Sequence, residues 1–113
     1  MAASLDLLQG THDLLVLRTL SAGPMHGYTV AREIKERSKS VFLVEEGALY
    51  PALHRLERAG WVESEWGLSE NNRRARFYTI STAGRAHLRS EAALWMRYAG
   101  AVTQVLRAAP TLA

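Results

Sequence analysis

The sequence lacks the residues and runs that several classes of protein require. It contains no cysteine, which excludes disulfides and cysteine metal sites and agrees with a reducing cytoplasm, the location that we expect. No apolar run approaches the roughly 20 residues of a transmembrane span, and the N-terminus lacks the basic and then apolar pattern of a secretion signal. We therefore expect no association with a membrane.

Residue patterns that support catalysis are also lacking. The four histidines show no metal-ligand spacing, and the sequence contains no carboxylate pair, nucleophile–base set or glycine-rich phosphate loop. The sequence therefore predicts that the protein is not an enzyme and needs no metal or cofactor.

The charge is small overall but unevenly distributed. The 113 residues suffice for one core, and the net charge is only +3. Residues 1–49 contain five basic and six acidic side chains, whereas the segment from Arg73 to Ser90 contains five arginines and no acidic residue. Such a cluster suits a polyanion such as DNA, and a merely solvated positive face is the alternative.

Two helices are predicted before residue 40. The first begins at Thr11, a favourable N-cap, and ends before Gly23–Pro24, a pair that stops helices. The second runs from His26 to about Arg37, and the run Val41–Val44 then predicts a brief strand. Helical spacing predicts an inward face of Leu14, Leu17, Leu20, Val30, Ala31 and Ile34. An arm that packs on a partner is predicted from Leu5, Leu7 and Leu8.

A third helix is predicted from Gly47 or Ala48 to Gly60, which supplies the stop. This start follows from Pro51, since proline is tolerated in the first turn, where N–H groups have no helical partner. The predicted inward face consists of Leu49, Ala52, Leu53, Leu56 and Ala59. The other side of the helix is left polar and basic.

A β-hairpin is predicted to follow this helix. Its strands are Val62–Trp66 and Arg76–Ile80, with Tyr78 and Ile80 toward the core. Two tryptophans are predicted to join the core behind it, Trp61 and Trp66. A helix that enters the major groove beside a basic hairpin that lies along phosphates suits a DNA duplex. The predicted fold class is therefore mainly α with a small β-hairpin, a winged helix-turn-helix followed by a C-terminal helix.

The last helix is predicted from Ser81 or Thr82 to about Ala108. Apolar residues recur in it at alternating steps of four and three, which is the seam of a helix that packs along another helix. The seam consists of Leu88, Ala92, Trp95, Ala99, Val102 and Leu106. We therefore predict a homodimer, with a DNA-binding domain over residues 1–81, a dimerisation helix over 82–109 and a tail over 110–113.

The chain resembles the PadR family of bacterial transcriptional regulators over nearly its whole length. The resemblance rests on Leu14–Leu17, Gly23–Tyr28, Glu46–Glu57 and Arg73–Tyr78, of which the third is the most specific. It implies the short form of the family, which binds operator DNA as a dimer and usually represses. Ala48 departs from the pattern, because serine or threonine is expected there, and a hydroxyl for capping or for phosphate is lost.

The predicted DNA-binding residues are Tyr28, Gly47, Ala48, Tyr50, Pro51, His54, Arg55, Arg73, Arg74 and Arg76. Tyr50 is predicted to contact phosphate, and His54 and Arg55 to reach base edges or backbone. For Arg55 the alternative is an ion pair with a nearby carboxylate. Tyr28 opens the second helix, whose N-terminal amides suit a phosphate, and packing against the hairpin is its alternative.

The predicted function is a sequence-specific transcriptional regulator, a repressor that binds a pseudo-palindromic operator on double-stranded DNA. The alternatives are a winged-helix module that binds a protein, and a small-molecule binding protein without operator specificity. Trp95 has two interpretations. It packs in the dimer interface, or, as relatives that sense phenolic acids and drugs imply, it lines a pocket for a small aromatic effector.

Overall fold

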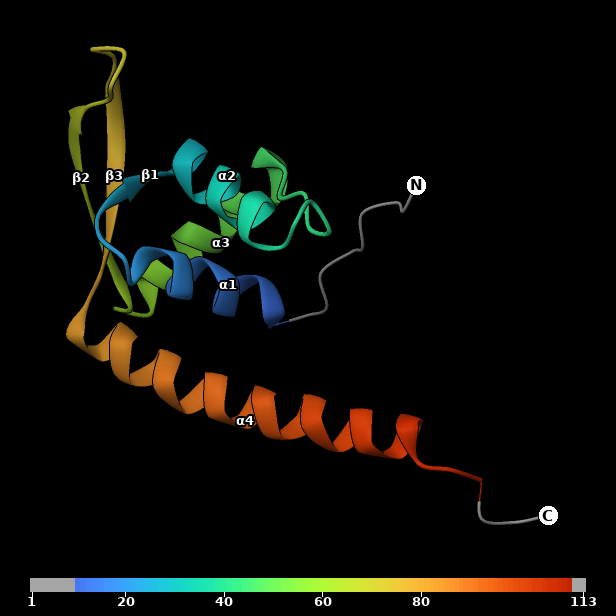
Figure 1. The fold of residues 1–113 in the computed structure, drawn as a ribbon. Helices are drawn as coiled ribbons and strands as arrows, with labels where there is room; N and C mark the ends of the chain where they lie inside the picture. The colour runs from blue at the N-terminus through green and yellow to red at the C-terminus, as the bar shows by residue number, and fades with distance from the viewer. Residues whose placement is uncertain (1–9, 111–113) are drawn as a thin grey trace.

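The computed structural model describes residues 10–110, so the predicted arm of Leu5, Leu7 and Leu8 lies outside the described residues. The elements in chain order are α1 (Thr11–Leu20), β1 (Met25–His26), α2 (Gly27–Arg37), α3 (Glu46–Arg58), β2 (Val62–Leu68), β3 (Arg74–Ile80) and α4 (Thr82–Arg107). Helices α1, α2 and α3 form one body, the hairpin β2–β3 projects beside it, and α4 extends beyond it (Figure 1). The predicted fold class is confirmed.

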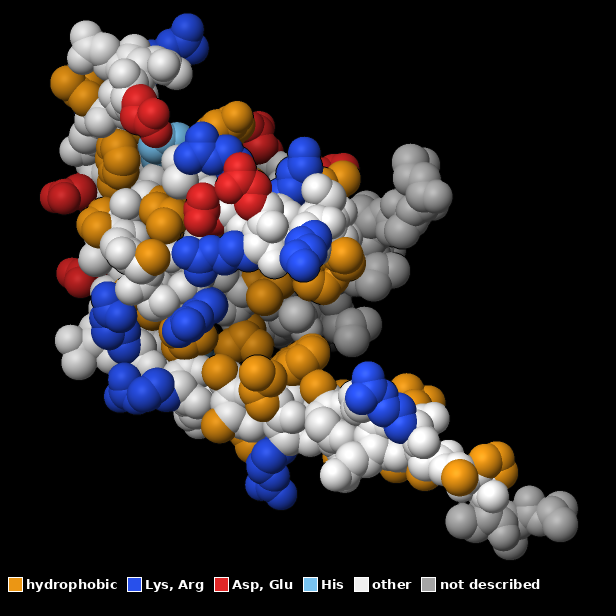
Figure 2. All heavy atoms as spheres, viewed as in Figure 1, with side chains coloured by type: hydrophobic (Ala, Val, Ile, Leu, Met, Phe, Trp, Pro, Cys, Tyr) orange, Lys and Arg blue, Asp and Glu red, His pale blue; other side chains and the backbone are white. Residues whose placement is uncertain are grey.

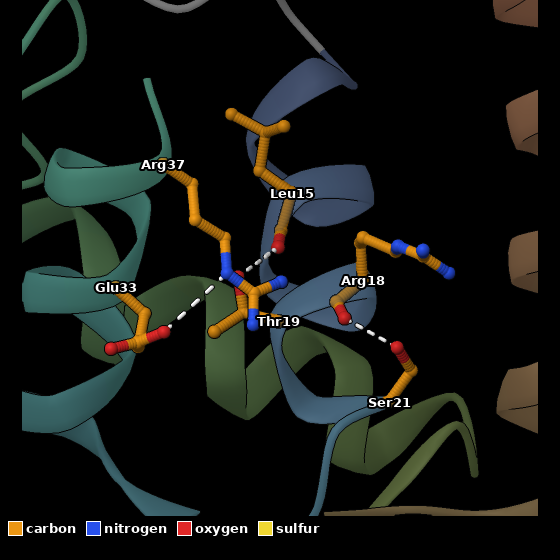
Figure 3. A network of polar contacts seen from close by, with 6 residues as sticks. All are labelled: Leu15, Arg18, Thr19, Ser21, Glu33 and Arg37. Carbon is orange, nitrogen blue, oxygen red and sulfur yellow. Dashed lines mark hydrogen bonds and ion pairs between the residues drawn. The ribbon is translucent and has the colours of Figure 1, made fainter. Parts of the chain in front are cut away.

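The core lies where the apolar faces of the three short helices meet the sheet and the start of α4. Its buried hydrophobic residues are Val16, Leu17, Leu20, Val30, Ile34, Leu49, Ala52, Leu53, Leu56, Val62, Tyr78, Ile80 and Leu88. The buried hydroxyl of Thr19 donates to the carbonyl of Leu15 at 2.8 Å, so it loses no hydrogen bond (Figure 3). On the neighbouring helix, Arg37 pairs with Glu33 one turn earlier.

The helix ends differ from the prediction by a residue or two. Gly10, in the left-handed conformation at φ 87°, caps α1, so Thr11 is the first helical residue rather than the cap. Helix α3 begins at Glu46, so Pro51 lies in the second turn instead of the first, and the Gly47 carbonyl lacks the usual donor four residues on. Gly60 has φ 81° and ends the helix as predicted.

The sheet has three antiparallel strands in the order β1–β3–β2. The predicted strand at Val41–Val44 was wrong, because that segment pairs with no strand, and its Phe42 and Val44 pack on the core from an irregular backbone. The strand that the prediction lacked is β1, Met25–His26, which pairs with Tyr78 and Phe77 of β3. It joins the start of α2 to the hairpin.

Both hairpin strands are longer than predicted, and one face of the hairpin is only partly covered. Four pairs share that face: Val62 with Ile80, Ser64 with Tyr78, Trp66 with Arg76, and Leu68 with Arg74. Helix packing buries Tyr78 and Ile80 as predicted, but Trp66 is 56% exposed. Its predicted place in the core was wrong, because the hairpin extends past the helices at that point. Trp61 does pack on the core.

Helix α4 is fixed to the body at its start. The Ser81 hydroxyl accepts from the Gly84 amide at 3.0 Å and donates to the Gly60 carbonyl at 2.7 Å. Gly84 packs against the backbone of Trp61, and Leu88 is 7% exposed.

The predicted inward place of Ala59 was wrong, since it lies exposed where α3 ends. Among residues 10–110, no helix combines the length and the apolar character needed to span a bilayer.

Candidate nucleic-acid interface

Helix α3 presents one exposed stripe on the side away from the core. Gly47, Pro51, His54 and Arg58 are exposed and follow one another at steps of four, three and four, so they share a face. Tyr50, also predicted to contact DNA, flanks this stripe on one side, and Ala48 flanks it on the other. Arg58 was absent from the predicted set, although its spacing from His54 is the signal that would have found it.

Arg55 is turned away from this stripe. Its guanidinium donates to a carboxylate oxygen of Asp13 on α1 at 2.9 Å. Of the two interpretations of Arg55, the geometry therefore favours the ion pair. The contact joins α3 to α1, and the cation remains half exposed.

Tyr50 lies against the start of α2. A Cβ atom at Gly27 would stand 2.8 Å from the Tyr50 hydroxyl oxygen, so a larger residue there would displace the end of the Tyr50 ring. Beside Gly27 and Tyr50, a groove of about 610 Å³ separates the starts of α2 and α3. Neither helix start has a side-chain cap, so the first-turn amides leave both ends partly positive. The Ala48 amide, however, donates to the Glu45 carbonyl at 3.0 Å, and the carboxylates of Glu45 and Glu46 line the same groove, so the charge at the start of α3 is mixed.

Tyr28 packs toward the hairpin and is also exposed. Its ring stacks on His26 at 6.2 Å between centroids, and His26 meets Phe77 of β3 edge-on at 5.5 Å, so the residue does pack toward the hairpin. Tyr28 is nevertheless 65% exposed, and the guanidinium of Arg32 lies 5.9 Å from its ring centroid. Arg32 was not in the predicted set. The four-residue spacing of an aromatic and an arginine on a helix is the signal for it.

The hairpin, here called the wing (residues 62–80), presents three arginines in two different states. Within residues 10–110, Arg73 and Arg74 form no ion pair, whereas Arg76 lies 3.6 Å from a carboxylate oxygen of Glu57 on α3. Its Nε also donates to the Ser64 hydroxyl at 2.9 Å. Arg73 and Arg74, toward the tip of the wing, are therefore cations without an ionic partner among the described residues. Arg76, nearer the base, is paired with Glu57.

The charge elsewhere is more mixed. On the face over α2, Lys and Arg side chains lie among Asp and Glu side chains (Figure 2). Hydrophobic side chains gather along α4 in the same view. In the part of the chain that the structure describes, no group of three or more histidine or carboxylate side chains is arranged to hold a metal ion.

Comparison with known families agrees with this geometry. The model of the transcriptional regulator PadR-like family matches residues 16–90, which includes α2, α3 and the wing. The chain belongs to the PadR-like family of transcriptional regulators. A mycobacterial relative, the transcriptional regulator Rv3488 of Mycobacterium tuberculosis, is 36% identical over 75 residues, which cover 66% of each chain.

Solved structures of PadR-like and other regulators share the fold. A transcriptional regulator from Clostridium thermocellum superposes with a TM-score of 0.79 at 25% identity, over 91% of this chain and 97% of that one. A PadR family transcription regulator from Clostridium difficile gives 0.75 at 27% identity, over 86% and 99%. The predicted family is thus confirmed. These comparisons assign no role to single residues.

Proposed function

We propose that this PadR-like protein is a sequence-specific DNA-binding repressor that occupies a pseudo-palindromic operator as a homodimer. The observation that supports it best is the exposed stripe of α3, bordered by a wing whose Arg73 and Arg74 form no ion pair within residues 10–110. A bacterial regulator of this kind acts in the cytoplasm, where the chromosome lies.

In the proposed complex, α3 enters the major groove with His54 and Arg58 toward base edges. An arginine that binds guanine with two hydrogen bonds contributes roughly 1–3 kcal/mol of discrimination. Gly47 and Pro51 have no long side chain, so the start of α3 approaches the DNA backbone closely. Tyr50 lies beside the groove between the two helix starts, where its hydroxyl is placed to donate to a phosphate.

The wing supplies the contacts that do not depend on sequence. Arg73 and Arg74 neutralise phosphates or lie along the minor groove, and each neutralised phosphate steepens the salt dependence of binding. Arg55 contributes less directly and Arg76 makes no phosphate contact of its own, because Asp13 and Glu57 already compensate their charges. Their side chains remain partly exposed.

The dimer is proposed to form through the distal half of α4. Its apolar stripe is buried at Leu88 by the chain's own core, but Trp95 and Val102 are about 40% exposed and Leu106 is 78% exposed. Ala92 and Ala99 lie half-buried along the same stripe. A second copy related by a two-fold axis would cover the stripe with its own. Leu88 then supports the interface from inside the subunit.

A charge placed on the stripe tests the dimer. Val102→Glu is expected to shift the sedimenting species from dimer to monomer at micromolar concentration, because the new carboxylate would be buried without a partner. Gln104→Glu introduces the same charge on the opposite side of α4 and should leave the dimer intact. A dimer that survives Val102→Glu would place the interface elsewhere.

An effector site is proposed in a cleft of about 580 Å³ between α1 and α4. Its lining includes Trp95, Tyr98 and Glu91, together with Trp61, whose ring stacks on His87 at 3.6 Å. Aromatic faces beside a carboxylate suit a flat organic cation. Titration with planar cations should quench tryptophan fluorescence in the wild type and less so in Trp95→Leu. An unchanged signal across a broad panel leaves Trp95 as a packing residue.

The decisive experiment is an anisotropy titration with the DNA just upstream of the gene, against scrambled DNA of equal length. A preference of about 10³ or more for the upstream DNA would establish an operator-binding regulator. Arg58→Gln should reduce the preference about 10-fold or more, whereas Arg97→Gln, a matched change on α4, should not. Equal binding to both DNAs would indicate a distant operator or nonspecific binding. No binding to either would favour a protein-interaction module.

A further inference from the structure

The wing exposes a tryptophan that the core does not use. Trp66 is 56% exposed, although tryptophan is among the most hydrophobic side chains, and it lies on the wing face that points toward α3. That orientation follows from its neighbours on the same face, since Ser64 and Arg76 contact Glu57 of α3. The ring therefore lies on the side of the wing that the proposed DNA would face.

Two arginines lie over this ring. The guanidinium carbon of Arg74 is 4.6 Å from the ring centroid, and that of Arg76 is 5.7 Å away. Both distances lie within the roughly 6 Å over which the negative face of an aromatic ring attracts a cation. Arg76 is directly opposite Trp66 in the strand register, and Arg74 is opposite Leu68, two pairs nearer the tip.

Arg76 is itself anchored to α3. Its Nε donates to the Ser64 hydroxyl at 2.9 Å, that hydroxyl donates to Glu57 at 2.5 Å, and a second guanidinium nitrogen lies 3.6 Å from the same carboxylate oxygen. An unbroken series of contacts therefore runs from Glu57 through Arg76 and Trp66 to Arg74. Only Arg74, at its end, has no carboxylate partner among residues 10–110.

We propose that Trp66 and Arg76 are positioning residues, which hold Arg74 in place for a DNA phosphate without binding DNA themselves. This inference rests on the proposed DNA-binding function. A free arginine loses rotamer freedom when it binds, and a side chain already held against a ring loses less. The anchor on Glu57 fixes the cation relative to α3, so the phosphate contact and the major-groove contacts stay in register.

A double-mutant cycle on DNA affinity tests the role of Trp66. Trp66→Leu should weaken operator binding about 2–5-fold per subunit, the range expected for an exposed cation–ring contact. In an Arg74→Gln background the same change should have no further effect, because Trp66 acts through Arg74. Val105→Ala, which shortens an exposed apolar side chain on α4 and away from the wing, is the control and should change nothing in either background.

The salt dependence of binding tests the role of Arg76. Arg74→Gln should reduce the slope of log affinity against log salt by about 0.9 per subunit, since one phosphate contact is lost. Arg76→Gln should lower the affinity and leave that slope unchanged. Thermal unfolding of each variant reports whether the fold is intact.

The outcomes separate the two levels of the proposal. A Trp66→Leu effect that persists in the Arg74→Gln background would mean that Trp66 touches DNA directly, and would overturn its positioning role. A slope that flattens in Arg76→Gln would overturn the same role for Arg76. If the wild type shows no binding to any DNA, the proposed function itself is rejected, and this inference with it.

Discussion

Two glycines in α4 are expected to respond in opposite ways to alanine, and the reason is the contact that one of them makes. Gly84 is buried, and a Cβ built there would overlap the Trp61 carbonyl oxygen and stand 2.9 Å from Cγ1 of Ile80. Gly100 has nothing within 4 Å of such an atom. Helix propensity alone favours alanine at both sites by about 1 kcal/mol.

The overlap at Gly84 outweighs that gain. The obstructing atom is backbone, and it is already held by the Ser81 amide at 3.0 Å, so it cannot rotate aside as a side chain would. Forcing an extra methyl into a packed site costs roughly 1–3 kcal/mol or more, and a fixed backbone atom calls for the upper end. Gly84→Ala should therefore lower the free energy of unfolding by about 2 kcal/mol net, and Gly100→Ala should raise it by about 1 kcal/mol.

Thermal unfolding followed by far-UV circular dichroism measures both. For a domain of this size about 4 °C corresponds to 1 kcal/mol, so the midpoint should fall about 8 °C in Gly84→Ala and rise about 4 °C in Gly100→Ala. All three proteins are compared at one concentration, because the stability of a dimer depends on it. Gly100 lies on the side of α4 away from Trp95 and Val102, so its substitution leaves the proposed interface untouched. Equal gains in both variants would refute the close approach of α4 to Trp61.

Three further predictions concern the ends and contacts of the helices. Ser81→Ala should lower the free energy of unfolding by about 1 kcal/mol in urea titrations, since the cap of α4 is lost, and Ser81→Asp should recover part of it. His12 should make the protein less stable in acid. Its ring nitrogen Nε2 is buried and has no hydrogen-bond partner among residues 10–110. Burial is the main cause that lowers the pKa of His12 below 6.5, so stability is lost as pH falls from 6.5 through the lowered value. Urea titrations of His12→Phe should show a smaller loss between pH 7.5 and 5.5, and an identical loss would contradict this assignment. Asp13→Asn should cost only about 0.2–1 kcal/mol, because the pair with Arg55 is exposed to solvent, and a larger loss in the same assay would show that the pair is structural.

Short-range sequence patterns predicted the features that depend on neighbouring residues, namely helix faces, helix ends and strand faces. The steps of three and four in α3 identified the buried residues Leu49, Leu53 and Leu56, and Gly60 marked the end of the helix. In the second wing strand the adjacent Phe77 and Tyr78 left the alternation ambiguous, and the favoured choice of Tyr78 and Ile80 for the core was confirmed. These patterns succeed because a helix or strand repeats its contacts with a fixed period.

The misses came from information that is not local. Strand β1 has only two residues and exists because Met25 lies beside Tyr78, far along the chain. Val41–Val44 has strand-like residues but no strand to pair with. Alternation assigned Trp66 to the correct face of the wing, but no period reveals how far the helices cover that face.

The candidate site was predicted in outline and less well in detail. The exposed stripe of α3 and the wing could be recognised from the sequence, because helix faces and turn residues are local features. The partners of Arg55 and Arg76, Asp13 and Glu57, could not be, since each pair joins different elements. Those partners decide which cations are uncompensated, so charge counting alone overstated the basic surface.

The anchored start of α4 makes that helix a lever. From the clamp at Gly84 to Val105 the helix measures about 32 Å at 1.5 Å per residue, so a tilt of about 5° carries its far end through about 3 Å. Because Ser81 is the only residue between β3 and α4, the lever is hinged directly to the wing. In the proposed dimer, a slight change in the angle at which the two α4 helices cross would alter the distance between the two α3 helices. That change in distance would be a large fraction of a base-pair step.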